Sequence, residues 1–356
     1  MEILTSETLP AYLRTQEIIT NGESVQITPI PSMVNHVFRV RTGKGDLIVK
    51  QAGSTMSHFA DEPITPRRAE IEHAALACWS EIAAVHGLAT CVPEVRKYDA
   101  KHRTHIFTAI PEPAQILSVH LLQGNPQEGA LQKIAHLFAI VHSTTHDSAE
   151  LRQQFSGTDG LILKMKFFHF HMRDAVQQPE LRAKLSALID TTLSTHLALT
   201  HNDTNPKNIL INGDTPVLID YELASYGDPA FDLGTLFGQY YLCAILNFAA
   251  RQKYFAAIRS AWETYCATCR IPIITEREAV IVQHFSPFVW GRTFGRVSVP
   301  HLPTALRVIL ERISYAILLR PCQSFEESFA LVEEYQEELR AIPSLNVEAM
   351  VREVSL

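Results

Sequence analysis

The sequence predicts an α+β protein of two lobes, a small N-terminal lobe rich in β-strands and a larger, mainly helical C-terminal lobe. Short apolar-rich segments typical of strands lie within residues 1–110, whereas apolar residues at helical spacing dominate residues 111–356. The length of 356 residues fits about two domains, or one large unit with a cleft between two lobes. We therefore place the boundary between the lobes at residue 110.

The first lobe is expected to be a sheet followed by a helix. A turn at residues 43–46 carries two glycines and joins two alternating segments into a hairpin. A helix is expected over residues 66–85, because apolar side chains recur there at helical spacing. The predicted strands of this lobe cover residues 25–28, 37–41, 47–50, 94–98 and 105–110.

The second lobe begins after Pro111-Glu112-Pro113, which interrupts any regular element. Helices are expected at residues 131–142, at 179–196 and repeatedly from 231 to the end of the chain. Between them, the strands 209–211 and 217–219, joined by a turn at 212–214, form one hairpin. Polar residues cluster at both ends of this hairpin, which marks it as the place to look for chemistry.

The composition excludes several classes of protein. The formal net charge of −7 is opposite to that of a protein that neutralises the phosphates of a nucleic acid. No stretch approaches the roughly 20 apolar residues of a membrane helix, and the acidic N-terminal residues do not resemble an export signal. We expect a cytoplasmic protein with neither a nucleic-acid nor a membrane partner, present as a monomer or a homodimer.

The cysteines and paired histidines do not indicate a metal site. Six cysteines in a chain of this length fit reduced thiols. The pair Cys266 and Cys269 has no second pair at zinc-site spacing, so we interpret both as packing residues. His169 and His171 lack a nearby third ligand, and we interpret them as residues of a surface helix or strand.

Three residues around the hairpin of the second lobe form a pattern expected of phosphoryl transfer. Asp203 and Asn208 are five positions apart in a loop, and Asp220 follows at the end of the hairpin. Phosphoryl transfer needs a carboxylate to receive the proton of the acceptor hydroxyl, and oxygen ligands for Mg²⁺. The base and the magnesium-binding asparagine of the protein-kinase catalytic loop have the same spacing.

The first lobe contains the lysine expected to bind the phosphates. Lys50 ends a predicted strand, as does the lysine that contacts ATP phosphates in a protein kinase. Glu72, on the predicted helix, is the candidate partner that holds the Lys50 ammonium group in place, and Glu70 is a weaker alternative. A strand lysine, a helix glutamate and the acidic loop in this order predict an enzyme of the kinase type.

The segments 201–208, 219–222 and 227–233 resemble the aminoglycoside phosphotransferase and choline kinase superfamily of small-molecule kinases. The resemblance implies the bilobal protein-kinase-like fold, with ATP and Mg²⁺ as cofactors bound between the lobes and a small molecule with a hydroxyl group as acceptor. The roles it implies are Asp203 as the catalytic base, Asn208 and Asp220 as Mg²⁺ ligands, Lys50 as the phosphate-binding lysine, and His201 and Asp232 as structural supports of the catalytic loop.

Within that superfamily the first lobe is most similar to 5-methylthioribose kinases, at residues 35–40, 48–52 and 71–76. Residues 291–295 are similar to a paired-arginine segment that this family uses on its substrate, in which Arg292 matches one arginine and Gly291 replaces the other. A methylthioribose-like sugar is therefore the leading acceptor. The second-lobe motif is closer to choline and ethanolamine kinases, so choline, ethanolamine and aminoglycosides remain alternatives.

The predicted nucleotide loop departs from the family. Residues 29–35 contain no glycine, although glycines allow backbone N–H groups to approach phosphates closely. Asn35 remains as the candidate contact to the nucleotide, and Glu222 is a further candidate for a carboxylate that binds the substrate. The missing glycines motivate an alternative of another class, a catalytically silent pseudokinase that binds a metabolite or a partner.

Overall fold

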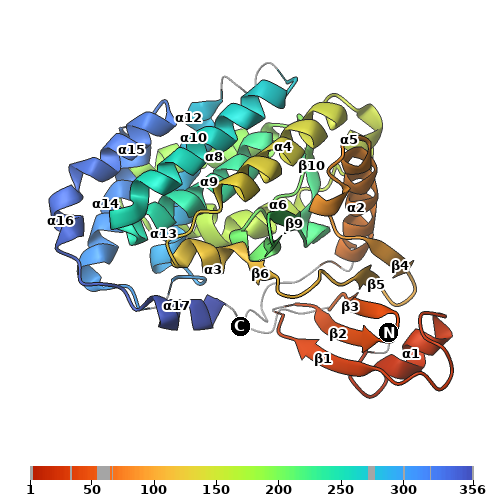
Figure 1. The fold of residues 1–356 in the computed structure, drawn as a ribbon. Coiled ribbons are helices and arrows are strands. Elements are labelled where there is room, and N and C mark those ends of the chain that lie inside the picture. Colours follow the sequence, from red (N-terminus) through yellow and green to blue (C-terminus); the bar gives the residue numbers. More distant parts are fainter. Residues whose placement is uncertain are drawn as a thin grey trace.

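The computed structural model describes residues 3–32, 34–53, 65, 67–271, 277–299, 301–320 and 322–354. A five-stranded sheet and the short helix α1 lie at one end of the molecule, and a larger helical part lies at the other (Figure 1). The predicted glycine-bearing hairpin, the strand pair that follows it and the helices of the second lobe are all present. The division into residues 1–110 and 111–356 stays a prediction.

The sheet is antiparallel with the strand order β1-β2-β3-β5-β4. Its central strand β3 pairs with β2 on one side and with β5 on the other, so that Lys50 lies opposite Val37 and His105. Helix α1 packs with the sheet around a small apolar core that includes Val49. The bounds are α1 Leu9–Thr15, β1 Gln26–Ile30, β2 His36–Thr42, β3 Gly45–Gln51, β4 Val95–Asp99 and β5 Thr104–Thr108.

Alternation along β3 decides which side chains face the helical part. Successive side chains of a strand point to opposite faces of the sheet. Leu47 and Val49 pack into the small core with α1, whereas Ile48 packs against the large core of the helical part. The same alternation sends the Lys50 side chain to the face that meets the helical part.

Helix α2, Arg68–Val85, connects the sheet to the helical part by packing. Its buried residues Ala75, Leu76 and Trp79 belong to the large core cluster rather than to the small one. The fully buried Trp79 ring makes edge contacts with Phe138 and Tyr221. Because α2 is anchored in this way, residues at its N-terminal end are held at a fixed position against the second lobe.

The helical part surrounds the central helix α9, whose residues are buried along almost its entire length. No single helix among the described residues is long and apolar enough to cross a bilayer, and only α9 together with the segment after it, bent by 113°, meets that test by length and composition. The bounds of the helices are α3 Leu117–Leu122, α4 Glu128–Thr145, α5 Ala149–Gln154, α6 Asp159–Met165, α7 His171–Ala175, α8 Pro179–Ser194, α9 Pro229–Leu246, α10 Arg251–Thr268, α12 Glu278–Gln283, α13 Phe285–Phe294, α14 Thr304–Leu319, α15 Phe325–Glu334, α16 Gln336–Arg340 and α17 Val347–Val354.

Two small sheets position the loops between α8 and α9. Strand β7 pairs with β10, and β8 pairs with both β9 and β6, so the predicted hairpin is β8-β9. Single-turn helices and one π-helical turn complete the chain. The bounds are β6 Gln115–Ile116, β7 Ala198–Thr200, β8 Ile209–Asn212, β9 Thr215–Leu218 and β10 Ser225–Gly227, with η1 Ala89–Cys91, η2 Lys166–Phe170, η3 Pro206–Asn208, η4 Tyr221–Leu223 and η5 Phe248–Ala250.

Candidate active site

Lys50 is the centre of an ion-pair cluster between the sheet and the helical part. Its Nζ lies 2.8 Å from Oε1 of Glu72 on α2, 2.5 Å from Oδ1 of Asp220 after β9, and 3.2 Å from Oε2 of Glu222. Glu72 is buried, whereas the exposed Glu70 forms no such pair in the part of the chain that the structure describes. The residues that the sequence singled out in two distant segments therefore meet at one point.

Burial and charge act in opposite directions on these groups. Burial lowers the pKa of Lys50, but the surrounding carboxylates outweigh it and raise the pKa well above its usual value. Burial raises the pKa of Glu72, and the ion pair with Lys50 only partly opposes this because Asp220 and Glu222 repel the Glu72 charge. The ammonium group therefore stays charged while three carboxylates share it.

Arg68 and Asn35 complete this cluster. Nη1 of Arg68, at the first position of α2, lies 2.6 Å from Oε1 of Glu222, and Nη2 donates to Oδ1 of Asn35 at 2.7 Å. Nδ2 of Asn35 in turn donates to Oε2 of Glu222 at 2.9 Å. Only 3% of Arg68 is exposed, so this is a buried connection between the loop before β2, helix α2 and the segment after β9. In this arrangement Asn35 and Glu222 are bound to each other.

The loop after β7 is held by Asp232 at the start of α9. Oδ2 of this buried carboxylate accepts the backbone N–H of His201 at 2.8 Å, and Oδ1 accepts that of Asn202 at 2.7 Å. His201 is also buried, and its ring contacts the carbonyl of Ile219 at 3.2 Å. Both residues therefore lie where they tie the loop to α9 and to the end of the β8-β9 hairpin.

Two residues of the site have left-handed backbone conformations. Asn202 has φ 63°, and Asp220 has φ 73°. Such conformations are costly for residues other than glycine, but Asn and Asp tolerate them best, and they concentrate at functional sites. Asn202 is stabilised by its side chain, which donates to the Leu223 carbonyl and to Oγ of Ser225. The local backbone is thus specified by the residue types at these two positions.

Asp203 lies in a strongly cationic environment. Its Oδ1 accepts a hydrogen bond from Nζ of Lys164, a buried lysine on α6. Burial raises the pKa of Asp203, but Lys164 and the neighbouring Lys207 outweigh it and bring the pKa to about 2. The carboxylate is therefore ionised throughout the physiological pH range, and only one of its two oxygens is engaged by Lys164.

Asn208 and Asp220 offer the kind of donors that Mg²⁺ prefers. Nδ2 of Asn208 donates to the backbone carbonyl of Asp203 at 3.0 Å, which leaves the side-chain oxygen as an acceptor. Asp220 is bound to Lys50 through one oxygen and its side chain is 29% exposed. In the described ranges no three acidic, histidine or cysteine side chains converge into a ready-made metal site. These hard oxygen donors still fit Mg²⁺, which commonly takes only one or two protein carboxylates and completes its shell with phosphates and water.

Arg292, at the end of α13, lies on the same side as Asp203. Its Nη1 donates to the Val297 carbonyl at 2.8 Å, and its guanidinium lies 5.8 Å from the centre of the Phe168 ring. Burial lowers the pKa of Arg292, and the charge of Asp203 opposes this. The preceding Gly291 faces Phe168 so closely that a Cβ would lie 2.6 Å from the ring. No side chain fits at this position without displacement of Phe168.

Two charged residues of the site have no distinguishing signal in the sequence, and one histidine lies elsewhere than predicted. Lys164 and Arg68 occur in helices where the sequence shows only the usual mixture of charged and apolar residues, and no local signal distinguishes them. His169 is not a surface residue: it is fully buried in η2, and its Nε2 lies 2.9 Å from Nδ1 of His284. The interpretation was wrong because the partner of His169 lies 115 positions away in the chain.

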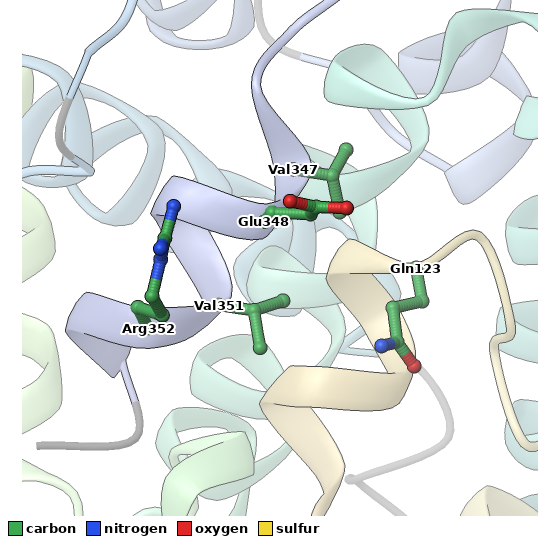
Figure 2. A pocket seen from close by; sticks show the side chains of 5 residues that line it. All are labelled: Gln123, Val347, Glu348, Val351 and Arg352. Carbon is green, nitrogen blue, oxygen red and sulfur yellow. The ribbon is translucent and has the colours of Figure 1, made fainter.

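A shallow pocket lies apart from these residues, between α3 and α17. It has a volume of about 280 Å³ and is lined by Gln123 and by one face of α17 (Figure 2). Val347 and Val351 supply its apolar surface, and Glu348 and Arg352 lie at its margin. None of the predicted site residues lines it.

The cysteines Cys266 and Cys269 are free thiols and belong to no metal cluster within the described residues.

Comparisons with known proteins agree with this geometry. The chain is 25% identical to a methylthioribose kinase of Bacillus cereus strain AH820 over 270 residues, which cover 66% of this chain and 65% of that protein. It is 24% identical to a methylthioribose kinase of Exiguobacterium sibiricum over 275 residues, or 69% of this chain and 68% of that protein. The first match thus spans slightly less than two thirds of the relative.

A solved structure and a family model define the fold and the family. The amicoumacin kinase hAmiN is 12% identical, with a TM-score of 0.51 over 91% of this chain and 99% of that chain, so the two share a fold. The predicted bilobal kinase-like α+β fold is therefore confirmed. Residues 26–267 match the model of the phosphotransferase enzyme family, abbreviated APH. Because this match covers more than half of the sequence, the chain belongs to the phosphotransferase enzyme family.

Proposed function

We propose that the protein transfers the γ-phosphoryl group of ATP to a hydroxyl group of a small molecule. The observation that carries this proposal is the convergence of Lys50, Glu72 and Asp220 at the edge of the loop that holds Asp203. Phosphoryl transfer requires a cation for the phosphates, oxygen donors for a metal and an ionised carboxylate for the acceptor. Family membership supports the same reaction class.

The residues fit ATP and Mg²⁺ as cofactors. Lys50 would contact the phosphates, Asn208 and Asp220 would hold Mg²⁺, and Asn35 would approach the nucleotide from the loop before β2. Mg²⁺ supplies neutralisation of the charge that develops on the transferred group. Glu72 keeps the Lys50 ammonium group in position, and His201 and Asp232 keep the loop of Asp203 in position.

Asp203 acts on the acceptor. The acceptor oxygen forms a bond to the γ-phosphorus, the bond from that phosphorus to the bridging oxygen of ADP breaks, and the hydroxyl proton passes to Asp203. A carboxylate with a pKa of about 2 is a weak base. It therefore orients the hydroxyl first and takes the proton only after the new bond has made that proton acidic. Lys164 holds one oxygen of Asp203 and leaves the other for the hydroxyl.

A methylthioribose-like sugar is the leading acceptor. Identities of 24 to 25% to methylthioribose kinases and the position of Arg292 near Asp203 support it. Choline, ethanolamine and aminoglycosides are the alternative acceptors. Glu222, the candidate substrate carboxylate, is engaged by Arg68 and Lys50, so a cationic acceptor would have to displace one of these residues to reach it.

The test is release of ADP from Mg-ATP with methylthioribose, choline, ethanolamine and an aminoglycoside panel as acceptors. We expect turnover that depends on the acceptor and falls by at least about 100-fold in Asp203→Ala, because a positioned general base contributes about that much or more. ATP binding, measured by thermal shift with and without Mg²⁺, should persist in this variant. Turnover near the wild-type rate in Asp203→Ala would show that another residue is the base.

The same assay distinguishes the proposed kinase from the alternative, a catalytically silent pseudokinase. Binding of Mg-ATP without acceptor-dependent release of ADP, over the whole panel, would favour a protein that binds but does not transfer. No stabilisation by Mg-ATP at all would contradict the proposed phosphotransferase function, because a ligand that binds the folded state must stabilise it.

A further inference from the structure

The two sides of the candidate active site differ in their balance of charge. On the side of the predicted nucleotide, the carboxylates of Glu72, Asp220 and Glu222 face the cations Lys50 and Arg68. With Lys207, which also acts on Asp220, the cations on this side equal the carboxylates in number. Asp220 has the most exposed side chain of the three carboxylates, in agreement with its proposed role as a Mg²⁺ ligand.

Cations outnumber carboxylates around Asp203. This single carboxylate is influenced by Lys164, Lys207 and Arg292. Lys164 is neutralised by direct contact with Asp203. Lys207 also acts on Asp220, so it lies toward the side where the phosphates are expected. Arg292 is the cation that remains for the acceptor.

Arg292 has unused capacity for binding. A guanidinium group has five N–H donors. Within the described part of the chain, the recorded hydrogen bond of Arg292 goes to the Val297 carbonyl, and no carboxylate forms an ion pair with it. The carboxylate that acts on Arg292 is Asp203, which Lys164 also contacts, so one negative charge faces two cations. A ligand that brings its own negative charge would complete this arrangement next to the proposed base.

Phe168 places Arg292 and Lys164 around one apolar surface. The Lys164 ammonium lies 5.3 Å and the Arg292 guanidinium 5.8 Å from the centre of the Phe168 ring. Gly291 allows the close approach of this ring, since any Cβ there would meet it at 2.6 Å. Lys164 of α6 and Arg292 of α13 thus lie near one aromatic ring, and Gly291 makes room for that ring.

We propose that the acceptor carries an anionic oxygen group, a carboxylate or a phosphate ester, which Arg292 binds while Asp203 binds the hydroxyl that is phosphorylated. The inference rests on the proposed phosphotransferase function but departs from its leading acceptor, because a methylthioribose-like sugar is neutral. It narrows the substrate class to hydroxylated acids or phosphorylated sugars of sugar-like size. An arginine binds both kinds of group through paired N–H donors. A cationic acceptor would instead be repelled by Arg292 and Lys164.

The test compares matched pairs that differ only in the anionic group: gluconate with glucitol, glycerate with glycerol, and ribose 5-phosphate with ribose. Binding to the full chain in the presence of Mg-ADP is measured by calorimetry, and ADP release with Mg-ATP is measured for the same compounds. At least one acidic compound should bind about tenfold more tightly than its neutral partner. Equal or weaker binding of every acidic compound would overturn the inference.

Variants assign the effect to Arg292. Arg292→Met should weaken binding of the preferred acid by about 10- to 100-fold, the usual range for loss of a charge-assisted hydrogen bond, and should hardly change binding of its neutral partner. Arg292→Lys should recover part of the loss. The matched control is Arg312→Gln, which removes an exposed arginine on α14 that pairs with Glu338. An equal loss for the acid and the neutral compound would contradict the assignment.

The failure of the inference and the failure of the proposed function can be distinguished. Binding needs no turnover, so the comparison of acids with neutral compounds decides the substrate class even for a protein that transfers no phosphate. Tight binding of neutral or cationic acceptors, together with their turnover, would keep the kinase and reject the anionic acceptor.

Discussion

At the scale of single residues, the site depends on charges that are shared rather than paired one to one. Lys50 forms ion pairs with three carboxylates, and Glu222 forms ion pairs with both Lys50 and Arg68. Phosphates that bind Lys50 must therefore compete with carboxylates that already surround it. Such competition keeps the lysine ordered before the nucleotide arrives, at the cost of some binding energy.

Replacement of Lys164 tests most directly what controls the ionisation of Asp203. In Lys164→Met, burial of Asp203 is no longer opposed by its nearest cation, so the pKa of Asp203 should rise from about 2. Because the base must be ionised to act, the acid limb of the pH profile of kcat should move to higher pH. The measurement is kcat from pH 9 down to the lowest pH at which both proteins stay folded.

The matched control for this prediction is Lys184→Met, which removes an exposed lysine on α8. Its pH profile should superimpose on that of the wild type. A profile of Lys164→Met that is lowered at all pH values without any shift would mean that Lys164 supports the fold and does not control the ionisation of Asp203.

At the scale of secondary-structure elements, α2 is the connection between the sheet and the helical part. Its middle packs Trp79 into the large core, and its first residue, Arg68, is bound to Glu222. The same helix carries Glu72, the partner of Lys50. A small rotation of α2 would therefore disturb the packing and the ion pairs together, so the helix positions the site by a rigid contact.

Replacement of Arg68 tests this connection. Arg68→Met leaves Glu222 with one cation fewer in a buried position, and breaking a buried ion pair costs about 3 kcal/mol of unfolding free energy. Urea denaturation measures the loss. The neighbouring Arg67 is exposed, so Arg67→Met should change the unfolding free energy by less than about 0.5 kcal/mol. Equal effects of the two variants would show that the contact with Glu222 contributes nothing.

At the scale of the whole molecule, several histidines are buried without charge. Burial lowers the pKa of His105 and of His284 to about 3, and it lowers that of His169 well below its ordinary value. The unfolded chain binds protons at these positions below about pH 6.5, whereas the folded chain does not. The contribution of these histidines to stability should therefore fall as the pH drops below 6.5.

The size of this effect follows from linkage. Between pH 7.5 and pH 5, His105 and His284 should each remove about 2 kcal/mol from the unfolding free energy. Asp228 and Glu72 act in the opposite direction, because burial raises their pKa to about 6 and about 7, which returns about 1 and about 2 kcal/mol. The carboxyl groups thus offset most of the loss from these two histidines, so the contribution of a single histidine has to be isolated.

Urea denaturation at pH 7.5 and pH 5 measures this change, and His284→Asn isolates one contribution. The difference between the two pH values should change by about 2 kcal/mol in this variant. A variant with the full wild-type difference between the two pH values would show that His284 does not contribute to it.

The sequence by itself determined much of this protein. Alternating segments specified the strands, apolar spacing specified the helices, and the order of Lys50, Asp203, Asn208 and Asp220 pointed to phosphoryl transfer. These features can be predicted because strand and helix periodicity and loop motifs depend on short stretches of the chain. The resemblance to small-molecule kinases also pointed to His201 and Asp232, whose contacts tie the loop to α9.

Only the tertiary structure decided which charges meet. The contact of Arg68 with Glu222 spans 154 positions, that of Lys164 with Asp203 spans 39, and that of His169 with His284 spans 115. In the sequence each of these residues looks like a solvated side chain of a helix or loop. Whether a charge is solvated, neutralised or left for a ligand depends on the groups that folding brings to it, because electrostatic interactions act through space and local patterns do not record them.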